Sequence, residues 1–369
     1  MTTPKDVIAE IFPRIEQVPD QHRLAGPIEQ TEYLVDGAFR HWRGPMGEAV
    51  SPVFLKTDAG LEPVCCGRYP LLTEQESLAA LDAAVAAYAQ GRGAWPTMSV
   101  AGRLDCTTEF LRLFKACRSE VVKLLMWEVG KSLADSEKEF DRTAVYIEET
   151  IEALKELDRV SSRLEIREGI IAQIRRGPLG VVLCMGPFNY PLNETFTTLI
   201  PALVMGNTVV FKPPRLGTML YRPLLAAFRD AFPPGVVNTV YGEGRRVVGP
   251  LMASGKIDVL AFIGSSGTAD SLKKQHPAPH RLRCVLGMGA KNPAIVLADA
   301  DLELTVRECV LGALSFNGQR CTALKILFVH RRIVESFNER LSAAIDALPF
   351  GCLLYTSPSP RDRTRARMP

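Results

Sequence analysis

The chain has 369 residues, of which 47% are hydrophobic and 23% are charged, and its formal net charge is +3 at pH 7. These values describe a folded globular protein long enough for two or more domains, and they exclude a chain that is disordered in bulk. The near balance of charge gives no reason to expect nucleic acid as a partner. No apolar run reaches the roughly 18 residues that span a bilayer, and the first residues do not open a signal peptide. We therefore expect no membrane partner and a cytoplasmic location.

The nine cysteines and five histidines lack the spacing of a metal site, so we predict none. An odd number of cysteines without a metal pattern fits a reducing compartment. Unreactive cysteines usually behave as small apolar core residues. We expect this of Cys65, Cys66, Cys106, Cys117, Cys184, Cys284 and Cys309.

Helical periodicity dominates the first part of the chain. Apolar residues recur at three and four positions over residues 74–89 and 101–128, and the helical pattern continues over 132–157. From residue 160 to 176 the pattern changes to a shorter alternation of apolar and polar residues, which predicts a pair of strands.

After Gly177 a strand followed by a helix is predicted four times, with the strands at residues 179–185, 207–212, 236–241 and 257–263. This alternation predicts an α/β fold with a doubly wound parallel sheet. A second unit begins near Ala290. Its predicted elements are a strand at 294–297, a helix at 302–315, a strand at 324–329 and a helix at 333–348.

A doubly wound sheet binds ligands beyond the carboxyl ends of its strands, where helix N-termini offer amides to anions. The chemistry is therefore expected at residues 186–189, 212–215, 242–244 and 264–266. No Gly-x-Gly-x-x-Gly fingerprint occupies the first turn, so an orthodox dinucleotide-binding motif is not recognisable there.

Cys321 differs from the other cysteines in its setting. It follows Arg320 in the polar turn of residues 316–322, Phe-Asn-Gly-Gln-Arg-Cys-Thr, and the strand-like residues 324–329 come directly after. A thiol attacks as its thiolate, which a neighbouring cation favours. Taken alone, Cys321 is also explained as a small core residue. Together with the motifs below, the pattern indicates an exposed, reactive thiol.

Several motifs in a fixed order carry a family resemblance. They are residues 128–131 (Glu-Val-Gly-Lys), 184–191 (Cys-Met-Gly-Pro-Phe-Asn-Tyr-Pro), 211–214 (Phe-Lys-Pro-Pro), 234–238 (Pro-Gly-Val-Val-Asn), 262–266 (Phe-Ile-Gly-Ser-Ser), 289–293 (Gly-Ala-Lys-Asn-Pro) and the cysteine turn. Over roughly residues 33–351 the chain resembles the aldehyde dehydrogenase superfamily, and most of all its non-phosphorylating glyceraldehyde-3-phosphate dehydrogenase branch.

The resemblance implies an aldehyde dehydrogenase-like fold, a Rossmann variant with a partial α/β catalytic domain. It divides the chain into an N-terminal helical part of the cofactor-binding domain (30–158), a bridging strand pair that joins subunits (159–178), a dinucleotide-binding domain (179–288) and a catalytic domain (289–351). It also implies that the full-length parent is a homo-oligomer, a dimer or tetramer. Residues 352–369 show no amphipathic period, and we interpret them as a non-native or disordered tail.

The resemblance also implies roles for single residues. Cys321 would attack a small-molecule aldehyde, and the Asn189 side-chain amide with the Cys321 backbone N–H would meet the resulting oxyanion. Donors aimed at a developing oxyanion are worth about 10² to 10³ in rate each. Taken alone, Asn189 is also explained as a turn residue before Tyr190.

For the cofactor, the resemblance implies contacts from the loops after the strands. Residues that would contribute are Pro187, Phe188, Lys212, Gly242, Gly264 and Ser265. Many NAD-preferring relatives have a glutamate three residues after the lysine, where this chain has Arg215. A guanidinium can pair with a 2′-phosphate that a carboxylate repels. NADP is therefore the expected cofactor, and NAD remains possible.

The chain departs from the family at the base that activates the deacylating water. The usual Glu-Leu-Gly-Gly-Lys is here Gly-Met-Gly-Ala-Lys, residues 287–291, so Gly287 replaces the glutamate. One alternative is that another group, supplied by the substrate or by a displaced acid, serves as the base. A second is that coenzyme A, whose thiol needs no strong base, accepts the acyl group. Another is a catalytically incomplete fragment that only binds dinucleotide.

The expected reaction is oxidation of glyceraldehyde 3-phosphate to 3-phosphoglycerate. Tyr190 and Arg320 match positions that this branch uses around the substrate phosphate, and Arg142 offers a further cation on the preceding helix. Tyr190 also occurs in branches that oxidise apolar aldehydes, and a surface salt bridge is the alternative role of Arg142.

Overall fold

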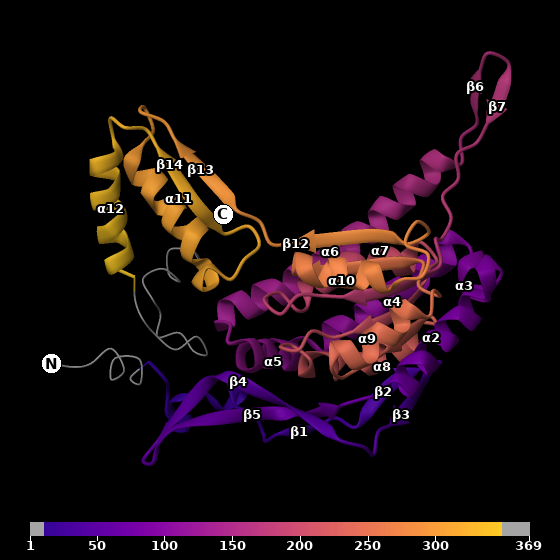
Figure 1. Ribbon diagram of the computed structural model, residues 1–369, viewed down its shortest axis with the longest axis horizontal. Coiled ribbons are helices and arrows are strands. Elements are labelled where there is room, and N and C mark those ends of the chain that lie inside the picture. Colours follow the sequence, from indigo (N-terminus) through magenta and orange to yellow (C-terminus); the bar gives the residue numbers. More distant parts are fainter. Residues whose placement is uncertain (1–10, 349–369) are drawn as a thin grey trace. The chain divides into compact units, whose positions relative to one another are not determined.

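The structure is a computed structural model that describes residues 11–348 (Figure 1). The predicted tail at 352–369 lies outside this part of the chain. The described residues form two compact units, 12–287 and 288–348, and each is treated by itself. Along residues 11–348 no helix is long and apolar enough to cross a membrane.

A five-stranded sheet forms the centre of the first unit. Its strands are β8 (Val181–Met185), β9 (Thr208–Lys212), β10 (Val237–Thr239), β11 (Val259–Gly264) and β12 (Arg283–Met288), in the order β10-β9-β8-β11-β12. Strand β8 is buried along its whole length and pairs in parallel with both β9 and β11. The chain therefore reverses its direction of winding between β8 and β11, and the predicted doubly wound sheet is confirmed.

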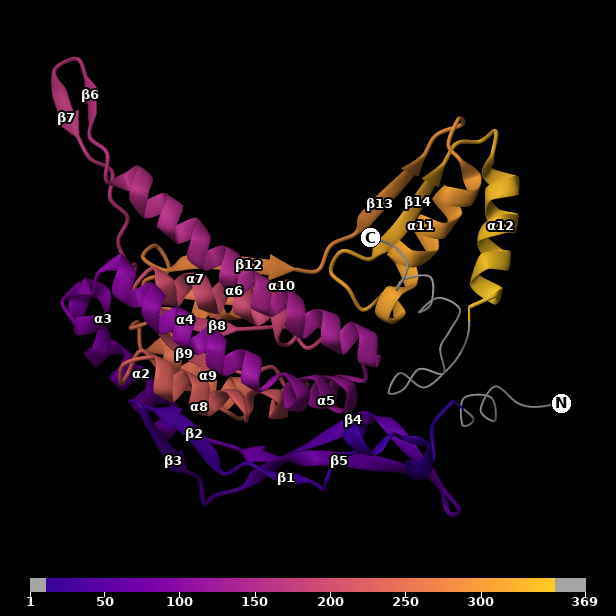
Figure 2. The same ribbon diagram turned by 180° about the vertical axis from the view of Figure 1, so that it is seen from behind.

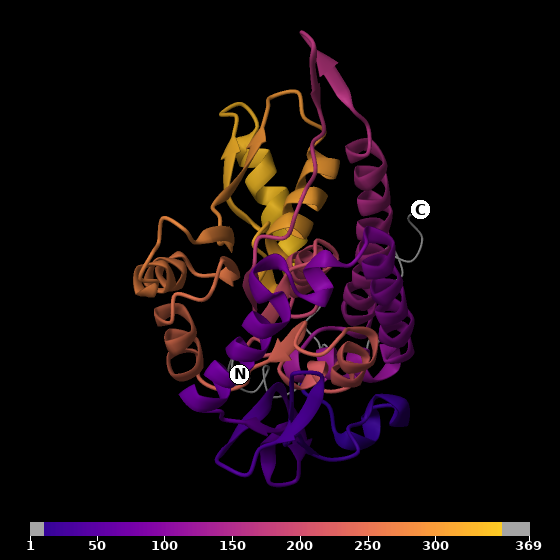
Figure 3. The ribbon, with the colours of Figure 1, turned by 90° about the vertical axis from the view of Figure 1, so that its right-hand side faces the viewer.

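Helices cover both faces of this sheet. On one face lie α2 (Glu74–Tyr88), α9 (Gly244–Ala253) and α10 (Ser266–Gln275); on the other lie α7 (Asn193–Val204) and α8 (Leu224–Ala231), with α4 (Val100–Ala116), α5 (Arg118–Val129) and α6 (Leu133–Ser161) packed outside them. Figure 3 shows magenta α6 and the orange helices of residues 244–275 on opposite sides. The short α3 (Ala94–Thr97) precedes α4.

Local sequence fixes the ends of these helices. Thr73 caps α2 by accepting a hydrogen bond from the Gln75 amide at 3.2 Å, while Glu76 accepts one from the Thr73 amide at 2.9 Å. Helix α5 ends at Gly130, whose φ of 74° is a left-handed conformation that favours glycine.

Three sequence predictions need correction. The helix predicted over 101–128 is two helices, because Cys117 leaves helical geometry and its carbonyl accepts the first bond of α5, from the Val121 amide at 3.0 Å. The resemblance placed residues 30–158 in an N-terminal helical part of the cofactor-binding domain, but residues 28–70 form strands. The structure has β1 (Ile28–Glu29), β2 (Glu32–Val35), β3 (Ala38–His41) and the long hairpin of β4 (Met46–Thr57) and β5 (Gly60–Pro70).

The third correction concerns Cys284, which was expected in the core. It lies on β12 at the edge of the sheet and is exposed, as is its neighbour Val285 at 53%. Every residue of β12 is exposed or only partly buried, so this strand lacks the buried apolar run of the other strands in the sheet. Cys66, Cys184 and Cys309 are buried, and Cys65, Cys106 and Cys117 are partly buried.

The predicted strand pair exists as a hairpin of β6 (Glu165–Arg167) and β7 (Ile170–Ala172) that extends from the end of α6 (Figure 2). Its turn places Glu168 and Gly169 at positive φ. Apolar side chains on and beside it are between 61% and 70% exposed: Leu164, Ile166, Ile170, Ile171 and Ile174.

The second unit has the predicted strand, helix, strand, helix order. Strands β13 (Asn292–Val296) and β14 (Leu324–Val329) pair in parallel, and α11 (Leu302–Leu314) and α12 (Val334–Asp346) pack on one face. Phe337, fully buried, is the largest side chain of this small core.

Candidate functional site

A cavity of about 520 Å³ opens at the carboxyl ends of the strands in the first unit. It lies at the change of winding direction, where doubly wound sheets bind their ligands. The lining residues come from the ends of β8, β9 and β11 and from helices α9 and α10: Met185, Gly186, Lys212, Pro213, Pro214, Gly244, Arg245, Val248, Gly249, Phe262, Gly267, Thr268, Ser271, Leu272 and Gln275.

Two cations face this cavity. Lys212 ends β9, is partly buried and donates to the Pro213 carbonyl at 3.1 Å. Burial lowers the pKa of Lys212 to about 8. Arg245, in the first turn of α9, is the second cation. Arg215, the arginine that the sequence singled out, is exposed and is not part of the lining.

The other predicted cofactor residues belong to the same strand-end loops. Ser265 caps α10 by accepting from the Thr268 amide at 3.3 Å. A Cβ on Gly264 would lie 2.4 Å from the Phe262 ring, so only glycine fits there without moving the ring. Gly242 has a φ of 120°, which also favours glycine. Pro187 is partly buried, and Phe188 is 48% exposed.

Asn189 lies in the loop between β8 and α7. Its Oδ1 accepts a hydrogen bond from the Tyr190 amide at 3.1 Å. Because the backbone N–H can only donate, the side-chain oxygen must face it. The Nδ2 end of Asn189 is therefore directed away from its own backbone, as an oxyanion donor requires.

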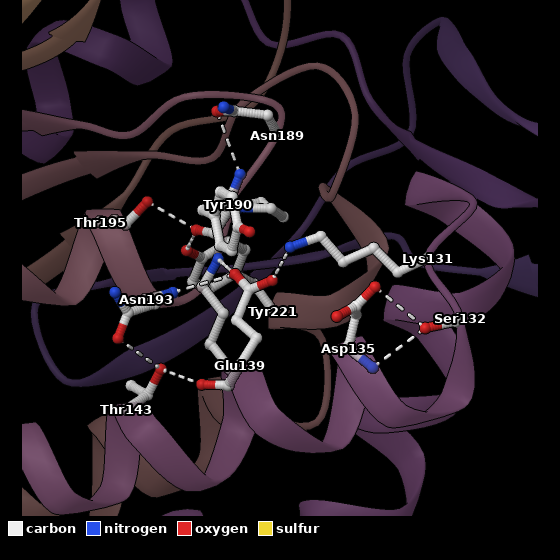
Figure 4. A network of polar contacts seen from close by, with 12 residues as sticks. Lys131, Ser132, Asp135, Glu139, Thr143, Asn189, Tyr190, Asn193, Thr195 and Tyr221 are labelled. Carbon is white, nitrogen blue, oxygen red and sulfur yellow. Dashed lines mark hydrogen bonds and ion pairs between the residues drawn. The ribbon is translucent and has the colours of Figure 1, made fainter. Parts of the chain in front are cut away.

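A buried ion pair lies behind this loop (Figure 4). The Lys131 ammonium contacts Glu139 Oε2, and the two side chains are 1% and 0% exposed. Glu139 Oε1 accepts from the Leu192 and Asn193 amides, each at 3.1 Å, at the start of α7. Burial lowers the pKa of Lys131 and raises the pKa of Glu139, and each partner's charge opposes that change.

A second buried carboxylate holds the loop after β9. Glu128 accepts hydrogen bonds from the amides of Thr218 (2.6 Å), Met219 (3.0 and 3.1 Å) and Leu220 (3.3 Å). The Thr218 hydroxyl donates in turn to the Pro214 carbonyl at 2.6 Å. Burial raises the pKa of Glu128 to about 7, against the effect of these amides.

In the second unit, Cys321 is exposed and follows a strained turn. Phe316 and Asn317 have φ values of 51° and 53°, which non-glycine residues rarely adopt. Asn292 Nδ2 donates to the Cys321 carbonyl at 2.6 Å and to the Ala323 carbonyl at 3.2 Å. This amide fixes the backbone of the cysteine to the first residue of β13.

Gly287, where the family has its base, lies on β12 with an ordinary backbone conformation. A Cβ there would lie 3.2 Å from Cγ1 of Ile263, so a larger residue fits only if that side chain shifts slightly. Within residues 11–348 no group of His, Cys, Asp and Glu side chains could hold a metal ion.

The three predicted substrate residues are spread over both units. The Tyr190 ring lies under the Lys131 ammonium, with 3.5 Å between Nζ and the ring centroid. Arg142 is exposed on α6, and the ion pairs found along residues 11–348 do not include it. Arg320 is partly buried in the cysteine turn.

Sequence reasoning missed several residues of these sites. Arg245 sits in an exposed basic pair whose place on a cavity becomes visible only once α9 is positioned. Glu128, Lys131 and Asn292 were noticed as parts of motifs but given no role. The available signal was a glutamate directly after the buried run 124–127, because a buried carboxylate must find donors.

Comparisons with known proteins identify the family of the chain. The profile of the Aldehyde dehydrogenase family matches residues 62–357. The chain is 31% identical over 290 residues to the NADP-dependent glyceraldehyde-3-phosphate dehydrogenase of Streptococcus equinus, covering 77% of this chain and 60% of that protein. It is also 31% identical over 334 residues to the N-succinylglutamate 5-semialdehyde dehydrogenase of Burkholderia mallei (strain SAVP1), covering 87% and 65%.

Solved structures give the same result for the fold. The NADP-dependent glyceraldehyde-3-phosphate dehydrogenase of Bacillus halodurans C-125, complexed with NADP, has a TM-score of 0.77 at 31% identity and covers 88% of this chain and 66% of that one. Lactaldehyde dehydrogenase from Escherichia coli has a TM-score of 0.77 at 26% identity, with 89% and 66% covered. The chain spans less than two thirds of the length of the curated relatives above. With its profile match and its α/β fold, the chain belongs to the aldehyde dehydrogenase family.

Proposed function

We propose that this chain is part of an NADP-dependent aldehyde dehydrogenase that oxidises its substrate through a thioester on Cys321. The observation that carries the proposal is the exposed thiol of Cys321 in a strained turn. The backbone carbonyl of Cys321 accepts a hydrogen bond from Asn292 Nδ2 at 2.6 Å. Strained backbone and a fixed, accessible nucleophile are typical of catalytic turns.

The cavity of the first unit fits a dinucleotide. Its volume of about 520 Å³ is within the range of cofactor sites. Lys212 and Arg245 supply positive charge for phosphate groups, and the first turns of α9 and α10 add backbone amides. These residues would hold the cofactor, and bound NADP would supply the hydride acceptor.

The chain's own residues account for the acylation steps. The Cys321 thiolate adds to the aldehyde carbon, and the carbonyl oxygen becomes an oxyanion that the Asn189 amide and the Cys321 backbone N–H stabilise. The tetrahedral adduct then collapses to a thioester as its hydrogen leaves as hydride. Water or another nucleophile releases the acyl group and returns the thiol.

Cys321→Ser tests the assignment. The variant should lose the burst of NADPH that accompanies thioester formation, while its affinity for NADP stays within about twofold, because the cavity is lined by other residues. Peptide mapping after treatment with a thiol reagent should find Cys321 labelled before Cys284, an exposed cysteine outside the proposed chemistry. Preferential labelling of Cys284, with an unchanged burst in Cys321→Ser, would refute the proposal.

The glycine at position 287 favours acylation of coenzyme A as a second candidate function. A general base typically contributes 10² to 10⁴ in rate, and Gly287 offers none for water. A thiol attacks a thioester without such a base, so coenzyme A is a reasonable acceptor. Product analysis with and without coenzyme A distinguishes acyl-coenzyme A from free acid.

The matched experiment restores the base. Gly287→Glu combined with Ile263→Ala, which removes the γ carbons that approach to 3.2 Å and 3.3 Å, should speed hydrolysis of the thioester by tenfold or more. Ile263→Ala alone is the control. An unchanged hydrolysis rate in the double variant would show that another group already serves as the base.

For the substrate we propose a small aldehyde with an anionic group, and glyceraldehyde 3-phosphate as the first candidate. The support is the similarity to the Streptococcus equinus enzyme and the arginines Arg142 and Arg320. Relatives named for N-succinylglutamate 5-semialdehyde act on another anionic aldehyde. Comparing kcat/KM for both substrates and for an uncharged aldehyde tests the class, and preference for the uncharged one would reject it.

We also propose that the β6–β7 hairpin joins subunits. Its support is the exposure of Leu164, Ile166 and Ile170, each above 60%. Ile166→Glu with Ile170→Glu should lower the mass measured by light scattering. An unchanged mass would assign the association to another surface.

A further inference from the structure

The buried pair of Lys131 and Glu139 has no part in the chemistry proposed above, yet it contacts the loop that does. Lys131 lies between α5 and α6, and Glu139 lies on α6. The pair is fully removed from solvent, with side chains 1% and 0% exposed. Such a pair is weak evidence for stability, because apolar replacements of similar volume are often neutral or stabilising. The contacts of the pair with the loop after β8 indicate another role.

Glu139 fixes the end of the loop after β8. One oxygen, Oε1, accepts from the amides of Leu192 and Asn193, both at 3.1 Å. The other oxygen, Oε2, takes the Lys131 ammonium. The contact with Lys131 therefore fixes the rotation of the Glu139 carboxylate. The carboxylate in turn fixes the backbone at the start of α7.

The middle of the loop is held from the same side. The Lys131 ammonium lies 3.5 Å from the centroid of the Tyr190 ring, a cation–π contact in a desolvated setting. The Pro191 carbonyl accepts from the hydroxyls of Thr195, at 2.6 Å, and of Tyr221. Each residue from 190 to 193 thus has a fixed contact. Figure 4 shows Tyr190 and Asn193 beside Lys131 and Glu139.

Asn189 is the next residue, and its side chain depends on this anchoring. Its Oδ1 accepts from the Tyr190 amide at 3.1 Å, so the direction of Nδ2 follows the position of Tyr190. We propose that Lys131 and Glu139 are positioning residues that aim the Asn189 amide at the oxyanion. The inference rests on the proposed function, because it assumes the role given to Asn189.

The test replaces both charges at once, so that no unpaired buried charge prevents folding. Lys131→Met with Glu139→Gln keeps an oxygen for the Leu192 and Asn193 amides and removes the cation from the Tyr190 ring. The matched control is Lys115→Met with Glu148→Gln, an exposed ion pair between α4 and α6 with side chains 51% and 47% exposed. Thermal melts of both variants establish that they fold.

We expect the NADPH burst rate of the buried double variant to fall about 10- to 100-fold, because a misplacement of about 1 Å can cost that much. The NADP dissociation constant should stay within about twofold of wild type, and the control pair should change neither quantity. A folded buried variant with a wild-type burst rate would overturn the inference.

A double-mutant cycle separates positioning from general loosening. In an Asn189→Ala background, the buried replacement should slow the burst by less than about twofold, because its target is gone. Additive losses would mean that the pair acts elsewhere, and the inference would fail.

A spectroscopic measurement distinguishes failure of this inference from failure of the proposed function. The Asn189 side-chain amide resonance, in protein carrying isotope-labelled asparagine and assigned with Asn189→Ala, should shift or broaden in the buried variant and not in the control. An unperturbed resonance overturns the inference even if wild type oxidises no aldehyde. Absence of any burst in wild type, with a perturbed resonance, would refute the proposed function alone.

Discussion

The loops after β8 and β9 are each held by one buried glutamate, but only one of the two has a cation beside it. Glu139, behind the β8 loop, binds two backbone amides and Lys131. Glu128, behind the β9 loop, binds three backbone amides. Among the ion pairs of residues 11–348, none includes Glu128.

This difference indicates that the loops after β8 and β9 have different roles. The β8 loop carries Asn189, and a charge pair fixes it in one arrangement. The β9 loop carries Lys212 and Arg215, and its carboxylate has a pKa raised to about 7 by burial. We therefore expect changes at the β8 loop to appear in the chemical step and changes at the β9 loop to appear in cofactor affinity.

The largest expected effect is that of Asn189→Ala. Loss of one oxyanion donor should lower kcat by about 10² to 10³, while the NADP dissociation constant stays near that of wild type. Stopped-flow detection of NADPH and a binding titration measure the two quantities. A weakened NADP affinity with an unchanged kcat would show that the β8 loop acts in cofactor binding and not in the chemical step.

Glu128→Gln should give the opposite pattern. The new amide group faces the backbone donors of Thr218 to Leu220 and leaves one of them unsatisfied, a loss of roughly 1 to 3 kcal/mol. We expect NADP affinity to fall by about 5- to 100-fold at pH 8, with kcat at saturating NADP little changed. Glu120→Gln, at the exposed start of α5, is the control. A fall in kcat without loss of affinity would contradict the comparison.

Two arginines can explain a preference for NADP, and single variants distinguish them. Arg215 follows the β9 lysine but is exposed, whereas Arg245 lines the cavity. Replacing the responsible arginine by glutamate should shift preference toward NAD by roughly 1 to 3 kcal/mol, the scale of a charge-assisted hydrogen bond. Because of its place, we expect Arg245→Glu to have the larger effect. Equal affinity of wild type for NADP and NAD would remove the basis for either assignment.

Four of the five strands of the central sheet could be predicted from the sequence because they are largely buried. Runs such as residues 181–185 are apolar throughout and have no helical period. Strand β12 was missed because none of its residues is buried, and the consecutive residues Cys284 and Val285 are both exposed. The β4 and β5 hairpin was missed because it is long and irregular, with shifts of register between Ala49 and Val50 and again before Phe54.

Side chains that act over long sequence distances could not be predicted. Glu128 is 90 residues from Thr218 along the chain, and Glu139 is 53 residues from Leu192. In the sequence Glu139 looks like an ordinary polar position of an amphipathic helix, and Glu128 differs only by following the apolar run 124–127. Only the packing of α5 and α6 against the sheet shows that they are buried and must find donors. The roles of Cys321 and Asn189 come from the resemblance and stay proposals, because the two residues lie in separate units.

The smallest expected effect comes from deprotonation of Lys212. It should weaken NADP affinity and raise the free energy of unfolding. Its pKa in the folded protein is about 8 against an ordinary value of 10.5, so its charge is lost as pH rises through about 8. NADP affinity should therefore weaken above pH 8, by at most about tenfold per pH unit. In the same window the unfolded chain binds more protons than the folded one, so the free energy of unfolding of the cofactor-free protein should rise.

Lys212→Met provides the control for both signs. It has no proton to lose there, so both slopes should flatten between about pH 8 and pH 10. Calorimetric titration with NADP and urea unfolding at several pH values measure them. If affinity and stability changed with the same sign in wild type, or if Lys212→Met kept both slopes, the titrating group would be another one, and Lys212 would not supply the charge at the end of β9.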